Sequence, residues 1–162
     1  MSIRTQKLEN WVNAALKISQ EAEARIRTHA AKAYPHECCG ALLGRDGDDG
    51  REVMALVPLE NRRDDSPRNR FSITPEDFRL AEQKASEKRI DLIGWYHSHP
   101  DHPAEPSEFD REYAWPWYSY IIVRSEAQGT KEMNSWRLAD DRASYASEPI
   151  EIGSPAGMQQ QN

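Results

Sequence analysis

The sequence predicts an α/β or α+β domain built around one β-sheet. The chain has 162 residues, a length that suits one domain and allows a hydrophobic core without disulfides. Strand-like and helix-like segments are mixed along it, with one predicted helix before the sheet and another in its middle. We expect a flexible N-terminus at residues 1–10, the folded domain at 11–152 and a disordered tail at 153–162.

Two helices are predicted from composition and capping residues. The first covers about Trp11 to Ala33, a stretch rich in Ala, Glu, Lys and Arg without Gly or Pro, and Pro35 ends it. The second begins at the sequence TPED, residues 74–77, where the threonine can cap the helix and the proline suits its first position. We expect this second helix to end near Lys88.

The predicted strands are short runs of apolar and β-branched residues bounded by turn residues. They cover residues 40–44, 53–59, 70–73, 90–96, 118–123, 135–138 and 149–152. The RDGDDG segment at 45–50 predicts a turn, and the charged residues 61–69 predict a polar loop.

Charge and composition narrow the range of partners. The net charge of −6 disfavours nucleic acid, because phosphate binding requires a basic face. No apolar run reaches the roughly 20 residues of a membrane-spanning helix, and the first residues lack the apolar core of a secretory signal. The two cysteines, Cys38 and Cys39, are adjacent, and neighbours rarely bridge, so we expect no disulfide and a cytoplasmic location.

A cluster of histidines follows the predicted strand at 90–96. Three of the five histidines, His97, His99 and His102, fall within six residues. His97 and His99 lie two positions apart, so in extended backbone both rings leave the same face of the strand. Pro100 then fixes the backbone just after the second ring. Two imidazoles at the end of a strand are typical of one half of a zinc site.

A third ligand is available in the segment SEFD, residues 107–110, which follows a proline-rich loop. Ser107 can cap a short helix there, and Asp110, three positions on, shares a helix face with it. The same pattern alone is typical of a capping box with no role in chemistry. Next to the two histidines, we interpret Asp110 as a metal ligand. Three protein ligands leave the fourth zinc position open for water, as in catalytic sites.

Hydrolysis at such a site also requires a group that takes a proton from the water, whose pKa bound zinc lowers to about 7. Glu37 is a candidate because it lies between the end of a helix and an apolar strand. Acidic residues are scarce in that setting unless they face a site. The alternative is a half-exposed glutamate at a strand start, and spacing alone does not decide between the two.

The residues around the histidines resemble the motif H-x-H-P-x6-S-x2-D of the JAMM (MPN-plus) metalloproteases. Every fixed position of that motif is filled, by His97, His99, Pro100, Ser107 and Asp110. The segment YPHECCGALLG at 34–44 resembles the family's glutamate-bearing segment, in the short form of bacterial and archaeal members. The resemblance covers roughly residues 14–140.

This resemblance implies a fold, a cofactor and roles for individual residues. The family fold is a curved mixed β-sheet flanked by helices, with an architecture like that of cytidine deaminases. His97, His99 and Asp110 would bind Zn2+. Glu37 would act first as general base and then as acid, while Ser107 would donate a hydrogen bond to the water and the oxyanion. The implied reaction is hydrolysis of a peptide or isopeptide bond.

The compact chain resembles bacterial members that process small ubiquitin-like sulfur-carrier proteins. Only eight residues separate Asp110 from the strand expected at Ser119, which leaves little room for insertions that grip ubiquitin. The implied substrate is a bond at the C-terminal Gly-Gly of such a carrier, and family resemblance leaves a homodimer open.

The sequence also bears on three alternative functions. A non-catalytic MPN scaffold would have lost zinc ligands that this chain keeps. A JAMM deubiquitinase-like enzyme acting on another ubiquitin-like conjugate stays open. A nucleoside deaminase is disfavoured, because its H-x-E and P-C-x-x-C signatures are absent.

Several other residues lie near the motif. We expect Cys38 and Cys39 to be small buried residues rather than zinc ligands or a redox brake. In a strand, Cys39 would share a face with Glu37 and Cys38 would not. We expect His102 to be exposed in its loop. Trp115 and the aromatic residues at 117 and 118 suit packing, although Trp115 could line the substrate cleft.

Overall fold

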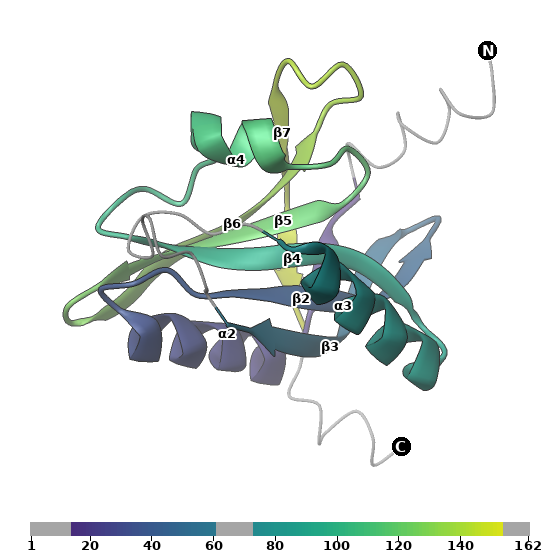
Figure 1. Cartoon of the computed structure of the whole chain (residues 1–162), viewed down its shortest axis with the longest axis horizontal. Coiled ribbons are helices and arrows are strands. Elements are labelled where there is room, and N and C mark those ends of the chain that lie inside the picture. The colour runs from purple at the N-terminus through teal and green to yellow at the C-terminus, as the bar shows by residue number, and fades with distance from the viewer. Residues whose placement is uncertain (1–13, 61–72, 154–162) are drawn as a thin grey trace.

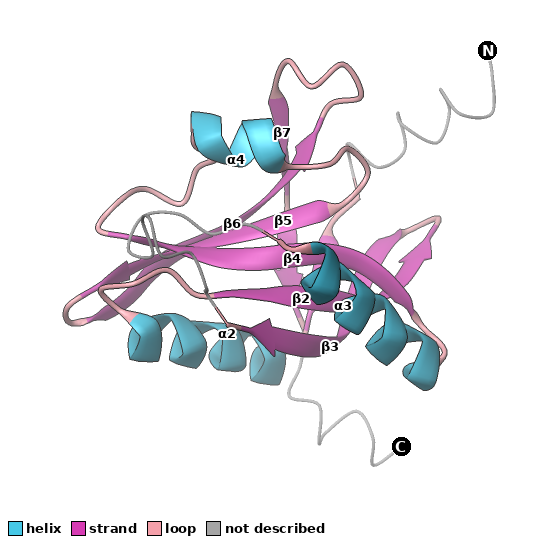
Figure 2. Ribbon diagram, viewed as in Figure 1, coloured by secondary structure: helices cyan, strands magenta, loops and turns pink. Residues whose placement is uncertain are grey.

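The computed structural model describes residues 14–60 and 73–153. These residues form a mixed β-sheet with helices packed against it (Figures 1 and 2). The helices are α2 (Gln20–Ala33), α3 (Pro75–Lys88) and α4 (Glu108–Tyr113). The strands are β1 (Leu16–Ile18), β2 (Cys39–Gly47), β3 (Gly50–Leu59), β4 (Asp91–Pro100), β5 (Ser119–Glu126), β6 (Gly129–Leu138), β7 (Tyr145–Glu148) and β8 (Ile150–Ile152).

The sheet has the strand order β7-β6-β5-β4-β2-β3-β1-β8. The β4–β5, β1–β3 and β1–β8 pairs are parallel and the others antiparallel, which confirms the predicted mixed sheet flanked by helices. The predicted flexible start at 1–10, the loop at 61–69 and nearly all of the tail at 153–162 lie outside the described residues, as does most of the strand expected at 70–73. Within the described ranges, no helix combines the length and the apolar character needed to cross a membrane.

The helix predicted from about residue 11 was wrong over residues 14–19, the described part before α2. Residues 16–18 form β1, and α2 begins only after Ser19, whose Oγ accepts a hydrogen bond from Ala22 N at 3.0 Å. Leu16 and Ile18 point into the core while Lys17 between them is partly exposed, the alternation of a strand. The parallel partner β8 lies more than a hundred residues away, so composition around Leu16 could not indicate this pairing.

Other boundaries shift as the sheet pairs its strands. The predicted turn at 45–50 narrows to residues 48 and 49, because β2 runs to Gly47 and β3 starts at Gly50. The strand expected at 90–96 continues to Pro100, paired with β5 along its extra length. The helix expected after Thr74 is confirmed, with reciprocal hydrogen bonds of 3.0 and 3.2 Å between Thr74 and Asp77.

The core lies on both faces of the sheet, and β4 contributes to each. Trp95 belongs to the cluster under α3, whereas its neighbour Tyr96 belongs to the cluster under α2. Both side chains are almost completely buried. Since successive side chains of a strand alternate, His97 and His99 continue the Trp95 face, and Ser98 continues the Tyr96 face. The core therefore fixes the direction in which each histidine points.

The parallel pairing of β4 and β5 places α4 beside the end of β4. Parallel neighbours need a crossover connection, and here residues 101–118 form it and contain α4 (Figure 1). The two strands approach closely at Gly94, where an added Cβ would lie 2.1 Å from Ser119 O. The connection at residues 101–118 starts at the carboxyl end of β4, next to the histidines, and it brings α4 to that end of the sheet.

We predict that Gly94→Ala destabilises the protein by at least about 1–3 kcal/mol, the usual cost of forcing extra volume into packed structure. The methyl group would collide with the backbone of β5. Gly47→Ala is the matched control, because an added Cβ there would meet only Gly50 O at 3.7 Å. Urea unfolding of both variants measures the difference, and equal stabilities would contradict a close β4–β5 contact.

Candidate metal centre

Three side chains that could hold a metal ion converge at the end of β4. His97 Nε2 lies 3.1 Å from His99 Nε2 and 3.4 Å from Asp110 Oδ1, and His99 Nε2 lies 3.1 Å from Asp110 Oδ2. One ligand atom from each residue lies within 4.8 Å of the other two. The side chains of the two histidines are 1% and 9% exposed, so the cluster is mostly shielded from water. The structure thus brings together the three residues expected to bind metal.

The short helix α4 supplies Asp110 through its own N-terminal cap. Ser107 Oγ accepts a hydrogen bond from Asp110 N at 3.0 Å, and Ser107 N donates to Asp110 Oδ2 at 2.9 Å. This is a complete capping box. Asp110 is therefore both part of a capping box and a candidate metal ligand, because the cap orients the carboxylate that faces the histidines.

The donor set fits a cation. His99 Nδ1 lies 2.9 Å from Pro103 O, and because a carbonyl only accepts, that nitrogen carries the ring proton. A neutral His99 ring then presents the lone pair of Nε2 to the Asp110 carboxylate, which also only accepts. Facing lone pairs in a buried site require a positive charge between them, either a proton or a metal ion. Two imidazoles and a carboxylate are a donor set that zinc commonly uses.

The pKa values of the cluster follow the same logic. Burial would raise the pKa of the Asp110 carboxyl, but His97 and His99 outweigh it and hold that pKa well below its usual range. Burial lowers the pKa of His97. It opposes ionisation of His99 as well, yet hydrogen bonding to Asp110 leaves the pKa of His99 raised. The carboxylate is therefore ionised and ready to bind a cation across the neutral pH range.

Glu37 lies just before β2 and is only 5% exposed. Cys39, two residues further along the chain, pairs with His97, which places the segment beside the strand that carries the histidines. Burial raises the pKa of Glu37 to about 8, against the opposing effect of His99. The burial of Glu37 excludes the alternative interpretation, in which this glutamate is half-exposed at the start of a strand. A carboxyl with a pKa near neutrality suits proton transfer in both directions.

The remaining predicted residues take ordinary positions. Cys38 and Cys39 are buried free thiols, on opposite faces of the sheet as expected, and burial raises the pKa of Cys38 to about 11. A thiol that resists ionisation is a poor metal ligand and nucleophile. His102 is exposed, as predicted. Trp115 is 41% exposed and packs edge-to-face on Phe78, with ring centroids 5.3 Å apart.

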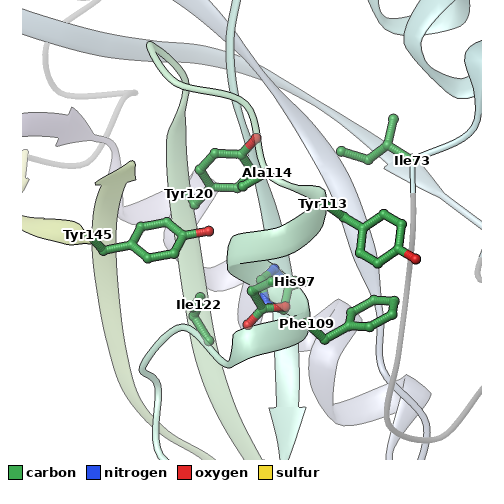
Figure 3. A pocket seen from close by; sticks show the side chains of 9 residues that line it. Ile73, His97, Phe109, Tyr113, Ala114, Tyr120, Ile122 and Tyr145 are labelled. Atoms are coloured by element: carbon green, nitrogen blue, oxygen red, sulfur yellow. The ribbon is translucent and has the colours of Figure 1, made fainter. Parts of the chain in front are cut away.

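A hollow beside the cluster is lined by residues that sequence reasoning missed (Figure 3). His97 and Asp110 form part of its wall. The other lining residues are apolar or aromatic: Ile73, Phe109, Tyr113, Ala114, Tyr120, Ile122 and Tyr145. Trp115 is not among them. Phe109 lies inside the SEFD segment and could have been noticed, whereas Tyr145 arrives through β7, a strand that the sequence did not predict.

Two histidines at the end of a central strand, an aspartate from α4 that faces them and a buried glutamate nearby are the arrangement of a JAMM-type metallopeptidase. The chain belongs to the family of prokaryotic homologues of the JAB domain, whose family model matches residues 19–139. The resemblance noted in the sequence is thereby confirmed.

Three similar proteins are informative. A desampylase of Haloferax volcanii is 32% identical over 123 residues, which cover 73% of this chain and 86% of the relative. A CysO-cysteine peptidase of Mycobacterium tuberculosis is 29% identical over 125 residues, covering 76% and 82%. The solution structure of a protein from Desulfitobacterium hafniense superposes with a TM-score of 0.75 at 29% identity, covering 86% of this chain and 93% of that one.

We predict that the stability of metal-free Glu37→Gln rises relative to that of metal-free wild type between pH 4.5 and about pH 8. The unfolded carboxyl ionises near 4.5, whereas the folded one stays protonated up to about 8, so only the wild type loses stability through this window. The loss should approach about 1.4 kcal/mol for each pH unit. Urea unfolding with a chelator measures it, and parallel pH profiles would contradict the raised pKa.

Proposed function

We propose that the chain is a zinc-dependent peptidase or isopeptidase that hydrolyses a bond at the C-terminal Gly-Gly of a small ubiquitin-like sulfur-carrier protein. The observation that carries this proposal is the convergence of His97, His99 and Asp110 beside the buried Glu37. Relatives named desampylase and CysO-cysteine peptidase support the substrate class. Family membership supports hydrolysis over a purely structural role.

His97, His99 and Asp110 would hold the ion. Zinc bound there would supply Lewis acidity, which polarises a carbonyl and lowers the pKa of water to about 7. Glu37 then takes a proton from the attacking water and hands it to the departing nitrogen, so that an amine leaves rather than an amide anion. Ser107 keeps its hydroxyl proton available, because its Oγ accepts from Asp110 N. That proton is donated to the oxygen on which negative charge develops.

The aromatic hollow suits an extended tail with small residues. Phe109, Tyr113 and Tyr120 stand close to the metal ligands, so side chains next to the scissile bond would have little space. Glycine has no side chain and reaches backbone conformations that other residues avoid. A Gly-Gly end therefore can approach the ion where bulkier sequences cannot. Two free thiols are consistent with the further proposal of a cytoplasmic location.

We predict that Glu37→Gln loses about 100- to 10,000-fold in turnover while it still binds one zinc per chain. The probe is a ubiquitin-like carrier protein with a dipeptide added after its Gly-Gly, and mass spectrometry measures the trimmed product.

Asp110→Asn should lose both zinc and activity in the same assay, because it removes the charge of a proposed ligand. Glu52→Gln, an exposed carboxylate on β3, is the matched control and should behave as wild type.

Three results would contradict this assignment. Equal trimming by wild type and Glu37→Gln would remove Glu37 from the reaction. Purified wild type without stoichiometric zinc after zinc loading would favour a non-catalytic scaffold. Failure of zinc-loaded wild type to trim any Gly-Gly carrier, with cleavage of a different ubiquitin-like conjugate, would favour a deubiquitinase-like enzyme.

A further inference from the structure

The residue between the two histidines, Ser98, has a role that metal binding does not explain. Its side chain is fully buried and leaves β4 on the face opposite His97 and His99. Ser98 Oγ accepts a hydrogen bond from Cys38 N at 2.8 Å, and Ser98 N donates to Cys38 O at 3.1 Å. Ser98 therefore holds both backbone polar groups of the residue that follows Glu37.

A second contact joins the same two segments on the other side of Glu37. The Tyr34 hydroxyl lies 2.9 and 3.1 Å from the two carboxylate oxygens of Asp101 and donates to them. Asp101 N in turn donates to Ser125 O on β5 at 2.8 Å. Its φ of +59° lies in the left-handed region, which aspartate and asparagine enter more readily than most residues. The backbone of Asp101 is thus bound to the sheet, and this fixes the position of the carboxylate that accepts from Tyr34.

The two contacts bracket the reacting groups on both segments. Glu37 lies in sequence between Tyr34 and Cys38, and His99 lies between Ser98 and Asp101. Residues 35–37 belong to neither α2 nor β2, so regular secondary structure does not fix Glu37. A general base must lie within hydrogen-bond reach of the proton it moves, and a misplacement of 1 Å can cost about 100-fold in rate.

We propose that Tyr34, Ser98 and Asp101 are positioning residues, which hold Glu37 at a fixed distance from the metal ligands through the Tyr34–Asp101 and Cys38–Ser98 contacts. The proposal rests on the proposed function in one respect, that Glu37 is the proton-transfer group. None of the three touches the substrate or the ion. Their loss displaces Glu37 and leaves the ligands and the aromatic hollow in place.

The Tyr34–Asp101 contact can be tested at the surface, where substitutions leave the core intact. Tyr34→Phe removes the donor, and Asp101→Gly removes the acceptor while permitting the positive φ. Asp101→Asn is the matched control, because its amide oxygen still accepts and asparagine also tolerates that backbone conformation. Wild type, these three variants and the Tyr34→Phe/Asp101→Gly double variant are loaded with zinc and assayed on the carrier probe with the added dipeptide.

We expect Tyr34→Phe and Asp101→Gly each to lower kcat at least about 10-fold, with KM within about twofold of wild type and one zinc per chain retained. Asp101→Asn should keep most of the wild-type kcat. The double variant should be no slower than the slower single variant, because both changes break one contact. Unchanged kcat in both single variants, equal loss in Asp101→Asn, or a loss confined to zinc content or KM would overturn the positioning role.

Amide hydrogen exchange tests the Cys38–Ser98 contact without any substrate. In Ser98→Ala, measured by NMR with and without zinc, the Cys38 amide should exchange at least about 10-fold faster, while amides in the middle of α3 keep their wild-type rates. Unchanged protection of Cys38 would overturn the proposal. If wild type fails to cut the probe, the proposed function fails, whereas the exchange rate of the Cys38 amide in Ser98→Ala still decides whether Ser98 holds this segment.

Discussion

Two imidazole nitrogens and a carboxylate that face one another in a buried site form the constraint on which the rest of the structure depends. Because His99 Nδ1–H donates a hydrogen bond to Pro103 O, the other ring nitrogen, Nε2, carries a lone pair that can bind a cation. The capped Asp110 is held opposite by the Ser107 amide. His99 and Asp110 are thus each oriented by a hydrogen bond that does not involve the ion. The site is preorganised, and a cation of suitable size relieves the repulsion among its donors.

The sheet explains how buried ionisable side chains, which oppose folding, stay in this arrangement. β4 is paired with β5 along both histidines and with β2 as far as His97, so its end is held in place opposite Asp110. Burying Glu37 and Asp110 opposes folding, and the apolar clusters under α2 and α3 offset that cost. Trp95 and Tyr96 anchor β4 in both clusters at once. Packing of the middle of β4 therefore stabilises the strand end that carries His97 and His99.

Local signals in the sequence were sufficient for the three candidate metal ligands and for one helix. The spacing of His97 and His99, the capping residues before Asp110 and the threonine that starts α3 all act within a few residues, so the sequence predicts them. β1 was missed because only its pairing with distant strands reveals it. The Tyr34–Asp101 contact was missed for the same reason, and the hollow depends on Tyr145 from an unpredicted strand. Site residues drawn from one short segment are predictable, whereas walls and positioning contacts depend on the tertiary fold.

X-ray absorption at the zinc edge of the zinc-loaded protein tests the central claim most directly. The account predicts scattering from two imidazole rings, with Zn–N distances of about 2.0–2.1 Å, and from oxygen ligands at similar range. It also predicts that no sulfur is bound, because Cys38 and Cys39 are buried thiols outside the cluster. A Zn–S distance of about 2.3 Å, or a spectrum with a third imidazole, would contradict it.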